Sequence, residues 1–259
     1  MASIRFFCKY ILHFITARNT GGYGIHSPFL FMFNRFVLQE KLPYYVFDSI
    51  EKLRSELKQN STEISITDFG TGFDRDRTIA EIAKKSLKSA RYGQLMFRIA
   101  NYFKASTVLE LGTSLGITTA YLSAASSKIN CVSLEGCPSI SAFARKNFQG
   151  LSLDNIQVIE GDINNTLESV IKDFNQLDLI FFDANHRSEP LLRYFELCMS
   201  KVHNQTIVLI DDIYWSKDME FAWNSIKNHP QVTSTFDLFH LGIVFFNTDL
   251  HKKHYKLRF

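Results

Sequence analysis

The chain has 259 residues, of which 46% are hydrophobic and 21% are charged, and it contains 12 glycines and five prolines. This composition is that of a globular protein and excludes collagen-like and low-complexity chains, and no apolar stretch reaches the roughly 18 residues of a membrane-spanning helix. The net charge is 29 − 26 = +3, yet residues 1–104 hold 16 Lys and Arg against nine Asp and Glu, whereas the rest holds 13 against 17. We therefore expect an N-terminal, mostly helical extension over residues 1–91 and a main domain over residues 92–259.

The extension begins with an apolar segment in which Ile4, Phe7, Ile11 and Phe14 recur at helical spacing. Charged residues interrupt the segment and no small-residue cleavage site follows, so it predicts an amphipathic helix packed on the protein rather than a signal peptide. A helix that lies on a membrane surface is the less favoured alternative. Further helices are expected over 29–39, 45–59, 78–89 and 92–103, and the segment ITDFGTGF at 66–73 is interpreted as a loop.

The main domain alternates strands with helices. Short apolar runs predict strands at 107–111, 130–134, 156–159, 177–182 and 206–210, with helical segments between them. This βα alternation indicates a parallel sheet covered by helices on both faces. Two last strands, at 232–238 and 242–247, are joined by three residues and must form an antiparallel hairpin. The prediction is an α/β, Rossmann-like sheet of seven strands whose last strand is antiparallel.

The first of these strands runs into the segment VLELGTSLGITTAYL, in which Gly112 and Gly116 allow a tight turn before a helix. The G-x-x-x-G spacing is not a dinucleotide fingerprint, and Glu110 would repel a phosphate but suits a ligand ammonium group. Glu135 ends the next strand, nineteen residues after Gly116, where a carboxylate can accept hydrogen bonds from ribose hydroxyls. Asp162 follows the third strand and can accept from an adenine amino group. Adenine, ribose and a cationic amino-acid tail together describe S-adenosylmethionine.

The segments VLELGTSLGITTAYL, SLEGCP, VIEGDI, LIFFDANH and VLIDDIYW together resemble class I S-adenosylmethionine-dependent methyltransferases, and among these the catechol and caffeoyl-CoA type of small-molecule O-methyltransferase. The resemblance covers about residues 92–247. The predicted cofactor-binding residues are Glu110, Gly112, Thr113, Ser114, Gly116, Glu135, Gly136, Asp162, Ile163 and Asp183.

Three carboxylates follow the fourth and fifth strands. Asp183 ends LIFFD, and Asp211 and Asp212 end VLIDD, so neighbouring strands bring them to one edge of the sheet. Unpaired carboxylates repel one another, and a hard cation such as Mg²⁺ relieves that repulsion. In the family that the chain resembles, two acids and a following Asn hold the metal, and Asp212 stands here in place of that Asn. The predicted metal ligands are Asp183, Asp211 and Asp212; a cofactor contact or a turn cap at Asp183 or Asp211 is the alternative.

His186 lies three residues after Asp183, where the metal-dependent family carries a Lys base. An imidazole titrates near neutral pH and can take the proton of a hydroxyl group. His186 and Asp183 are therefore the predicted catalytic residues, and His240 is a weaker rival to His186. Tyr214 and Trp215 are candidates either for the wall of an aromatic substrate pocket or for core packing.

The sequence thus predicts an O-methyltransferase that acts on a small hydroxyl acceptor, aromatic in our interpretation. A nucleic-acid methyltransferase that uses the basic extension and a cofactor-binding protein without catalysis are the alternatives, although no two prolines are adjacent as amino-group DNA methylases require. We expect a small-molecule partner, no nucleic acid and no transmembrane segment, and leave a homodimer open. Four cysteines without a C-x-x-C pair favour the cytoplasm.

Overall fold

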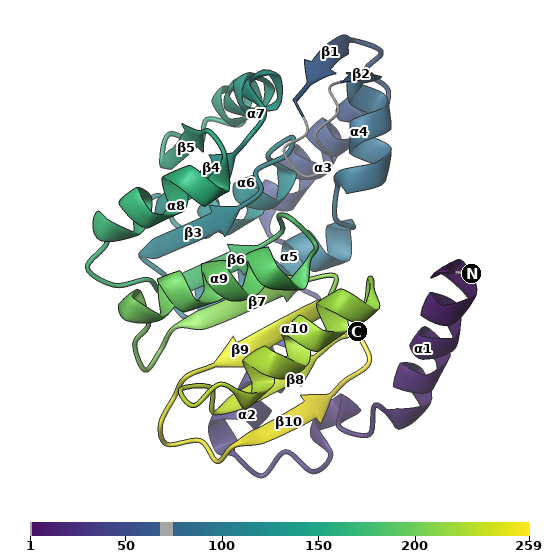
Figure 1. Cartoon of the computed structure of the whole chain (residues 1–259), viewed down its shortest axis with the longest axis vertical. Helices are drawn as coiled ribbons and strands as arrows, with labels where there is room; N and C mark the ends of the chain where they lie inside the picture. The colour runs from purple at the N-terminus through teal and green to yellow at the C-terminus, as the bar shows by residue number, and fades with distance from the viewer. Residues whose placement is uncertain (1, 68–74) are drawn as a thin grey trace. The chain divides into compact units, whose positions relative to one another are not determined.

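The computed structural model describes residues 2–67 and 75–259 (Figure 1), so the ITDFGTGF loop lies almost wholly outside the described residues. The chain forms two compact units. The first unit comprises Met1–Glu40 and Phe174–Phe259, and the second unit comprises Lys41–Asp173. Residues 1–91 thus contribute to both units, and a domain boundary after residue 91 stays a prediction.

The second unit contains three parallel strands in the order β3-β4-β5, with Leu111 opposite Leu134 and Glu135 opposite Glu160. The strands are β3 (Thr107–Leu111), β4 (Asn130–Glu135) and β5 (Ile156–Glu160). The helices around them are α5 (Ala90–Tyr102), α6 (Ile117–Ser123), α7 (Pro138–Gly150) and α8 (Ile163–Lys172). The predicted strands and helices of this segment are all present.

Helix α3 (Tyr45–Leu57) and helix α4 (Ile79–Ser86) also belong to the second unit. An antiparallel hairpin of β1 (Glu63–Ile66) and β2 (Arg75–Thr78) precedes α4 and was not predicted. Thr78 caps α4, since its hydroxyl accepts the N–H of Glu81 while the Glu81 side chain accepts the N–H of Thr78. The aromatic rings of Phe47, Phe97 and Tyr121 tie α3, α5 and α6 into one core.

The first unit contains five strands in the order β10-β8-β9-β7-β6, and β9 runs antiparallel to both of its neighbours. They are β6 (Leu179–Phe182), β7 (Ile207–Asp211), β8 (Ser234–Asp237), β9 (Leu241–Phe245) and β10 (Lys253–Lys256). The antiparallel insertion of the last predicted strand is confirmed. Among the described residues, these five strands and the three strands β3, β4 and β5 make eight, whereas the sequence predicted seven. The additional strand is β10.

Helices cover both faces of these strands (Figure 1), and the residues around the end of β9 show how. Phe245 contacts Phe33 of α2 at a ring-centroid distance of 5.3 Å, whereas the next residue, Phe246, stacks on Phe195 of α9 at 6.4 Å. Successive side chains of an extended segment point to opposite faces, so α2 and α9 lie on opposite sides. The helices are α1 (Ala2–Thr16), α2 (Pro28–Phe33), α9 (Ser188–Cys198), α10 (Lys217–Asn228), a π-helical turn at Asn34–Leu38 and 3₁₀ turns at Thr20–Gly22 and Met199–Lys201.

Among the described residues, no helix combines the length and the apolar character that crossing a bilayer requires.

Candidate functional site

Glu110 is fully buried in β3, and its two carboxylate oxygens have different surroundings. Oε2 accepts hydrogen bonds from the hydroxyls of Thr119 at 2.5 Å and Ser133 at 2.6 Å, whereas Oε1 has no hydrogen-bond partner among the described residues. Burial raises the pKa of Glu110 from 4.5 to about 7, against the lowering effect of the two hydroxyls. The buried oxygen Oε1 therefore suits a cationic partner, whose charge would favour the ionised carboxylate.

The turn between β3 and α6 depends on two glycines in the left-handed region, Gly112 with φ of 103° and Gly116 with φ of 82°. A side chain at Gly116 would place its Cβ 2.5 Å from the ring of Phe148 in α7. The turn is also tied to β4, since the Thr113 hydroxyl lies 2.6 Å from the Ser133 hydroxyl. The backbone of this turn is therefore fixed by its own unit.

Glu135, the last residue of β4, binds the same turn. Its Oε2 accepts the N–H of Ser114 at 2.9 Å, and its Oε1 accepts the N–H of Cys137 at 3.0 Å. Burial raises the pKa of Glu135, while these bonds and a backbone bond from Gly136 lower it. A carboxylate offers about four lone-pair positions, and the three backbone N–H groups leave at least one of them for a ligand hydroxyl.

Asp162 follows β5 and caps helix α8, since its Oδ1 accepts the N–H of Asn164 at 2.9 Å. Ile163 begins α8 and is buried. A capping role accounts for Asp162 within the described residues, and an adenine contact at Asp162 or Ile163 stays a prediction. The second unit thus brings Glu110, the Gly112–Gly116 turn, Glu135 and Gly136 together at the carboxyl ends of β3 and β4.

A second group of polar side chains lies in the first unit at the carboxyl ends of β6 and β7. One ligand atom each from Asp183, His186 and Asp211 lie within 4.8 Å of one another, and His186 Nε2 is 3.7 Å from Asp183 Oδ1. Asp211 is buried, and the other two side chains are partly exposed. We name Asp183, His186 and Asp211 the acid–histidine group.

Asp212 does not belong to the acid–histidine group. It follows Asp211 directly, has φ of 49°, and its Oδ1 lies 3.9 Å from Nδ1 of His240. Consecutive residues at the end of a strand direct their side chains differently, so the two acids do not converge. A metal role for Asp212 stays a prediction, as does the alternative base at His240.

The donor set of the acid–histidine group suits a divalent cation. Two carboxylates provide the oxygen ligands that Mg²⁺ prefers, and the imidazole adds a nitrogen ligand that favours first-row transition metals such as Mn²⁺. The predicted general base, His186, therefore lies where a third metal ligand would be. The residues fit a metal, and they give His186 two alternative roles.

The structure bears on one further candidate, Tyr214, and adds two residues to the site that the sequence analysis did not name. The Tyr214 hydroxyl donates to Asp237 Oδ2 at 2.6 Å and its ring packs on Phe239, which favours core packing of the two alternatives given for Tyr214. Ser133 and Thr119, which hold Glu110, were not predicted. Ser133 had a signal in the sequence, because it is a polar residue between Val132 and Leu134 in the buried middle of the strand.

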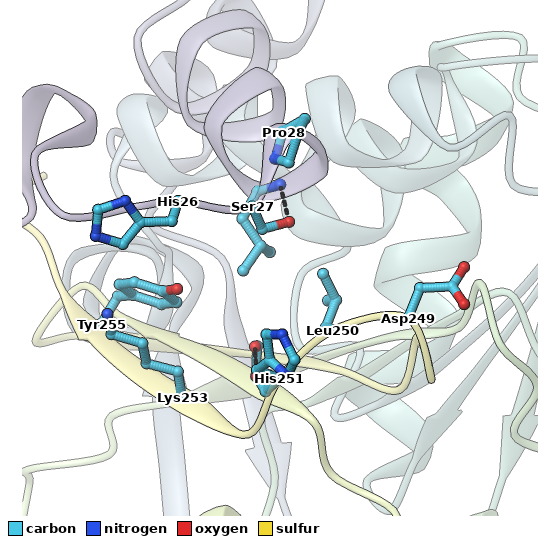
Figure 2. A pocket seen from close by; sticks show the side chains of 10 residues that line it. His26, Ser27, Pro28, Asp249, Leu250, His251, Lys253 and Tyr255 are labelled. Atoms are coloured by element: carbon cyan, nitrogen blue, oxygen red, sulfur yellow. Dashed lines mark hydrogen bonds between the residues drawn. The ribbon is translucent and has the colours of Figure 1, made fainter.

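The first unit also contains a cavity of about 380 Å³ that includes none of the predicted site residues. Figure 2 shows His26 and Tyr255 on one side of this cavity and Asp249 on the other, with His251 and Lys253 along the edge. The hydroxyl of Ser27 accepts the N–H of Leu30 and is occupied as the cap of α2.

Comparison with known proteins shows which proteins this chain is similar to. Residues 109–213 match the family model described as a methyltransferase domain. The catechol O-methyltransferase of Mycobacterium tuberculosis is 28% identical over 127 residues, which cover 48% of this chain and 56% of that protein. The catechol O-methyltransferase of Niastella koreensis is 27% identical over 128 residues, covering 48% and 57%. The chain therefore spans a little over half the length of these curated relatives.

Solved structures show the same fold over more of the chain. A cofactor-bound protein from MTB has a TM-score of 0.61 at 18% identity, covering 77% of this chain and 90% of that one. An O-methyltransferase from Bacillus cereus in complex with SAH has a TM-score of 0.59 at 16% identity, covering 82% and 96%. The O-methyltransferase TomG from Streptomyces achromogenes, in complex with SAM, has a TM-score of 0.58 at 13% identity, covering 82% and 94%. The predicted Rossmann-like methyltransferase fold is thereby confirmed.

Proposed function

We propose that this chain, with the methyltransferase fold and a methyltransferase-domain match over residues 109–213, is an S-adenosylmethionine-dependent O-methyltransferase acting on a small hydroxyl acceptor. The observation that carries the proposal is the buried Glu110 with its unpartnered Oε1, beside the Gly112 turn and the acceptor Glu135. The bound cofactor would supply a methyl group on a sulfonium centre.

Each part of that cofactor has a counterpart among the residues of the second unit. Oε1 of Glu110 would accept from the ammonium group, and Glu135 would accept from the ribose hydroxyls. The backbone of Gly112, Thr113, Ser114 and Gly116 would hold the methionine moiety, and Gly112 has no side chain that could block it. Gly136, Asp162, Ile163 and Asp183 complete the proposed cofactor-binding set.

The acid–histidine group is our proposed acceptor site. Asp183 and Asp211 would hold a divalent cation, with Asp212 as the further predicted ligand, and such a cation lowers the pKa of a bound hydroxyl group. If no cation binds, Nε2 of His186 takes the acceptor's proton while Asp183, 3.7 Å away, stabilises the resulting imidazolium. Chelation separates these two versions.

The curated relatives support the proposed class of acceptor. Both curated relatives are catechol O-methyltransferases, which supports a small aromatic acceptor with a hydroxyl group. The four cysteines are free thiols, which fits the cytoplasm as the compartment. The oligomeric state forms no part of the proposal.

Calorimetric titration with S-adenosylmethionine tests the cofactor site. Glu135→Ala removes two charge-assisted hydrogen bonds, each worth roughly 1.5–3 kcal/mol, so its affinity should fall at least tenfold. The matched control is Glu160→Ala, because Glu160 is the register partner of Glu135 but binds Ser141 and Arg145 instead. Unchanged affinity in Glu135→Ala, or no binding by the native chain, would refute the site.

A methyl-transfer assay tests the activity separately. Labelled S-adenosylmethionine and a panel of catechol-like acceptors should give methyl ethers. Cofactor binding without transfer to any hydroxyl or nucleic-acid acceptor would favour the cofactor-binding protein without catalysis.

A further inference from the structure

Helix α1 (Ala2–Thr16) presents an apolar face outward. Phe7 is 62% exposed and Ile15 is 65% exposed, although such side chains are normally buried. Ile4, Phe7 and Ile11 are spaced by three, four and seven residues, which places them along one side of the helix. The members of this outer face of α1 are Ile4, Phe7, Ile11, Leu12, Phe14 and Ile15.

The side of α1 that carries Arg5 and Lys9 faces the rest of the first unit instead of solvent. Nη2 of Arg5 lies 3.0 Å from Oε2 of Glu220 in α10, and the Lys9 ammonium pairs with Oε1 of the same residue. One turn further, the buried His13 is 3.1 Å from the carbonyl oxygen of Leu257 through Nε2. These residues recur every fourth position and hold one stripe of the helix against the body of the unit.

Aromatic contacts fix the same orientation. Phe6 and Tyr10 each lie 5.0 Å from the ring of Phe239, in the turn between β8 and β9. Phe6 also meets the edge of Trp215, which is 62% exposed. The helix cannot turn its outer face inward without breaking these contacts and the ion pairs. A surface helix normally exposes a polar side to solvent, so the second, exposed apolar side of α1 requires an occupant.

The surroundings of the outer face are basic. Residues 1–39 contain no Asp or Glu, and besides Arg5 and Lys9, which pair with Glu220, they contain Arg18 and Arg35. Residues 250–259 contain four Lys and Arg and no Asp or Glu. The two segments adjoin, since Asn19 N–H donates to Lys256 O at 3.2 Å and Arg258 Nε donates to Phe14 O at 2.8 Å. The Arg258 guanidinium lies 4.2 Å over the ring of Phe14, a member of the outer face. Exposed cations thus lie beside exposed apolar side chains.

We propose that the outer face of α1 docks on the surface of an anionic lipid bilayer. A helix with one apolar side lies in the interface plane with that side about 5–10 Å deep, and neighbouring Lys and Arg bind the anionic headgroups. A helix of 15 residues is too short to cross the hydrocarbon core, so the contact is peripheral. A second copy of the chain would bring the same basic segments together in a self-complementary contact, which like-charge repulsion opposes. Charge complementarity therefore selects the bilayer.

Vesicle co-sedimentation tests this proposal with the full chain. Vesicles of phosphatidylcholine and phosphatidylglycerol should bind the protein, and vesicles of phosphatidylcholine alone should bind it much less. The double variant Phe7→Gln, Ile11→Gln keeps helix-forming residues but removes apolar area, and its partitioning should fall at least tenfold. Leu42→Gln is the matched control, because Leu42 is 65% exposed but lies outside α1.

A charge variant and a fold check complete the experiment. Arg18→Gln removes one exposed cation after α1 and should weaken binding about fivefold at low salt, and added salt should weaken the native chain in the same way. Circular dichroism and thermal unfolding must show that the double variant is folded. Failure of the native chain to bind anionic vesicles, or equal binding by the double variant, would overturn the proposal. So would light scattering that shows a lipid-free dimer which the double variant converts to a monomer.

Discussion

The ionisation of Glu110 links cofactor binding to pH. Its pKa is raised to about 7 by burial, so below that pH the free protein holds a proton on the carboxyl that the ligand ammonium requires to be ionised. Affinity for S-adenosylmethionine should therefore fall as pH decreases from 8 to 6, by up to tenfold for each unit below the pKa. Calorimetry at pH 6, 7 and 8 measures this dependence. Glu110→Gln should bind weakly at pH 8 with a flatter profile, and an equally steep profile would contradict the assignment.

The same carboxyl group opposes folding when it is ionised. Its folded pKa lies above the unfolded value of 4.5, so its contribution to stability is fully present below pH 4.5 and is lost as pH rises through about 7. A difference of this size is worth roughly 3 kcal/mol. We expect Glu110→Gln to raise the free energy of unfolding at pH 8 and to change it little at pH 4, as urea denaturation measures. A variant that is less stable at pH 8 would show that the Thr119 and Ser133 hydrogen bonds outweigh the burial of charge.

Cation binding by the acid–histidine group can be measured without turnover. Titration of Mn²⁺ by calorimetry should show binding that Asp183→Asn and Asp211→Asn each weaken at least tenfold, because each loses a charged ligand of the group. Asp212→Asn should have a smaller effect, since Asp212 lies outside the group. Equal losses of Mn²⁺ affinity in all three variants would instead support Asp183, Asp211 and Asp212 as the ligands, as the family resemblance implies.

The activity arm of the experiment decides the role of His186. With a metal, EDTA should abolish turnover and Mg²⁺ or Mn²⁺ should restore it. If EDTA changes nothing and His186→Ala lowers the rate at least a hundredfold, the histidine acts as the base and the metal assignment is wrong. If neither treatment matters, Asp183 is better explained as a cofactor or turn residue.

At the scale of elements, the turn before α6 depends on a glycine that no other residue can replace without strain. Gly116 has φ of 82°, and a Cβ there would lie 2.5 Å from Phe148. Gly116→Ala should lower the free energy of unfolding by about 2–4 kcal/mol, from the left-handed backbone and the overpacked ring together. Gly150→Ala is the control, because nothing lies within 4 Å of its added Cβ. Denaturation with urea compares the two, and equal stability would contradict the close packing.

The sequence predicted the buried strands correctly and missed a strand that is mostly exposed. The strands β3, β4, β6 and β7 are almost wholly buried and therefore carry continuous apolar runs, which the sequence analysis identified correctly. Strand β10 was missed because Tyr255 is its single buried residue and its lysines and histidine hide the pattern. The convergence of His186 with Asp183 and Asp211 was missed as a ligand group, since the direction of a side chain after a strand depends on the local backbone and not on residue type.

At the scale of the whole molecule, the segment 1–40 is part of a core rather than an appendage. The ring centroid of Phe33 lies 5.6 Å from that of Phe236 and 5.3 Å from that of Phe245, and all three side chains are fully buried. Deletion of residues 1–40 should therefore expose the strands β8 and β9 and leave the protein insoluble. The milder variant Phe33→Ala should stay soluble and lose about 3–5 kcal/mol of stability. Expression yield and thermal unfolding measure both, and a soluble, folded deletion variant would contradict this placement.

The division of the first unit between two distant parts of the chain has a consequence during synthesis. The ribosome makes Phe33 and its neighbours first, but their partners Phe236 and Phe245 emerge about 200 residues later. At a synthesis rate of roughly 5–20 residues per second, the phenylalanine-rich N-terminal segment stays unpacked for on the order of ten to forty seconds. The continuous second unit, Lys41–Asp173, can complete its own packing in that interval. Nascent chains of this protein should therefore need a holding chaperone at the N-terminal segment until translation has reached the last strands.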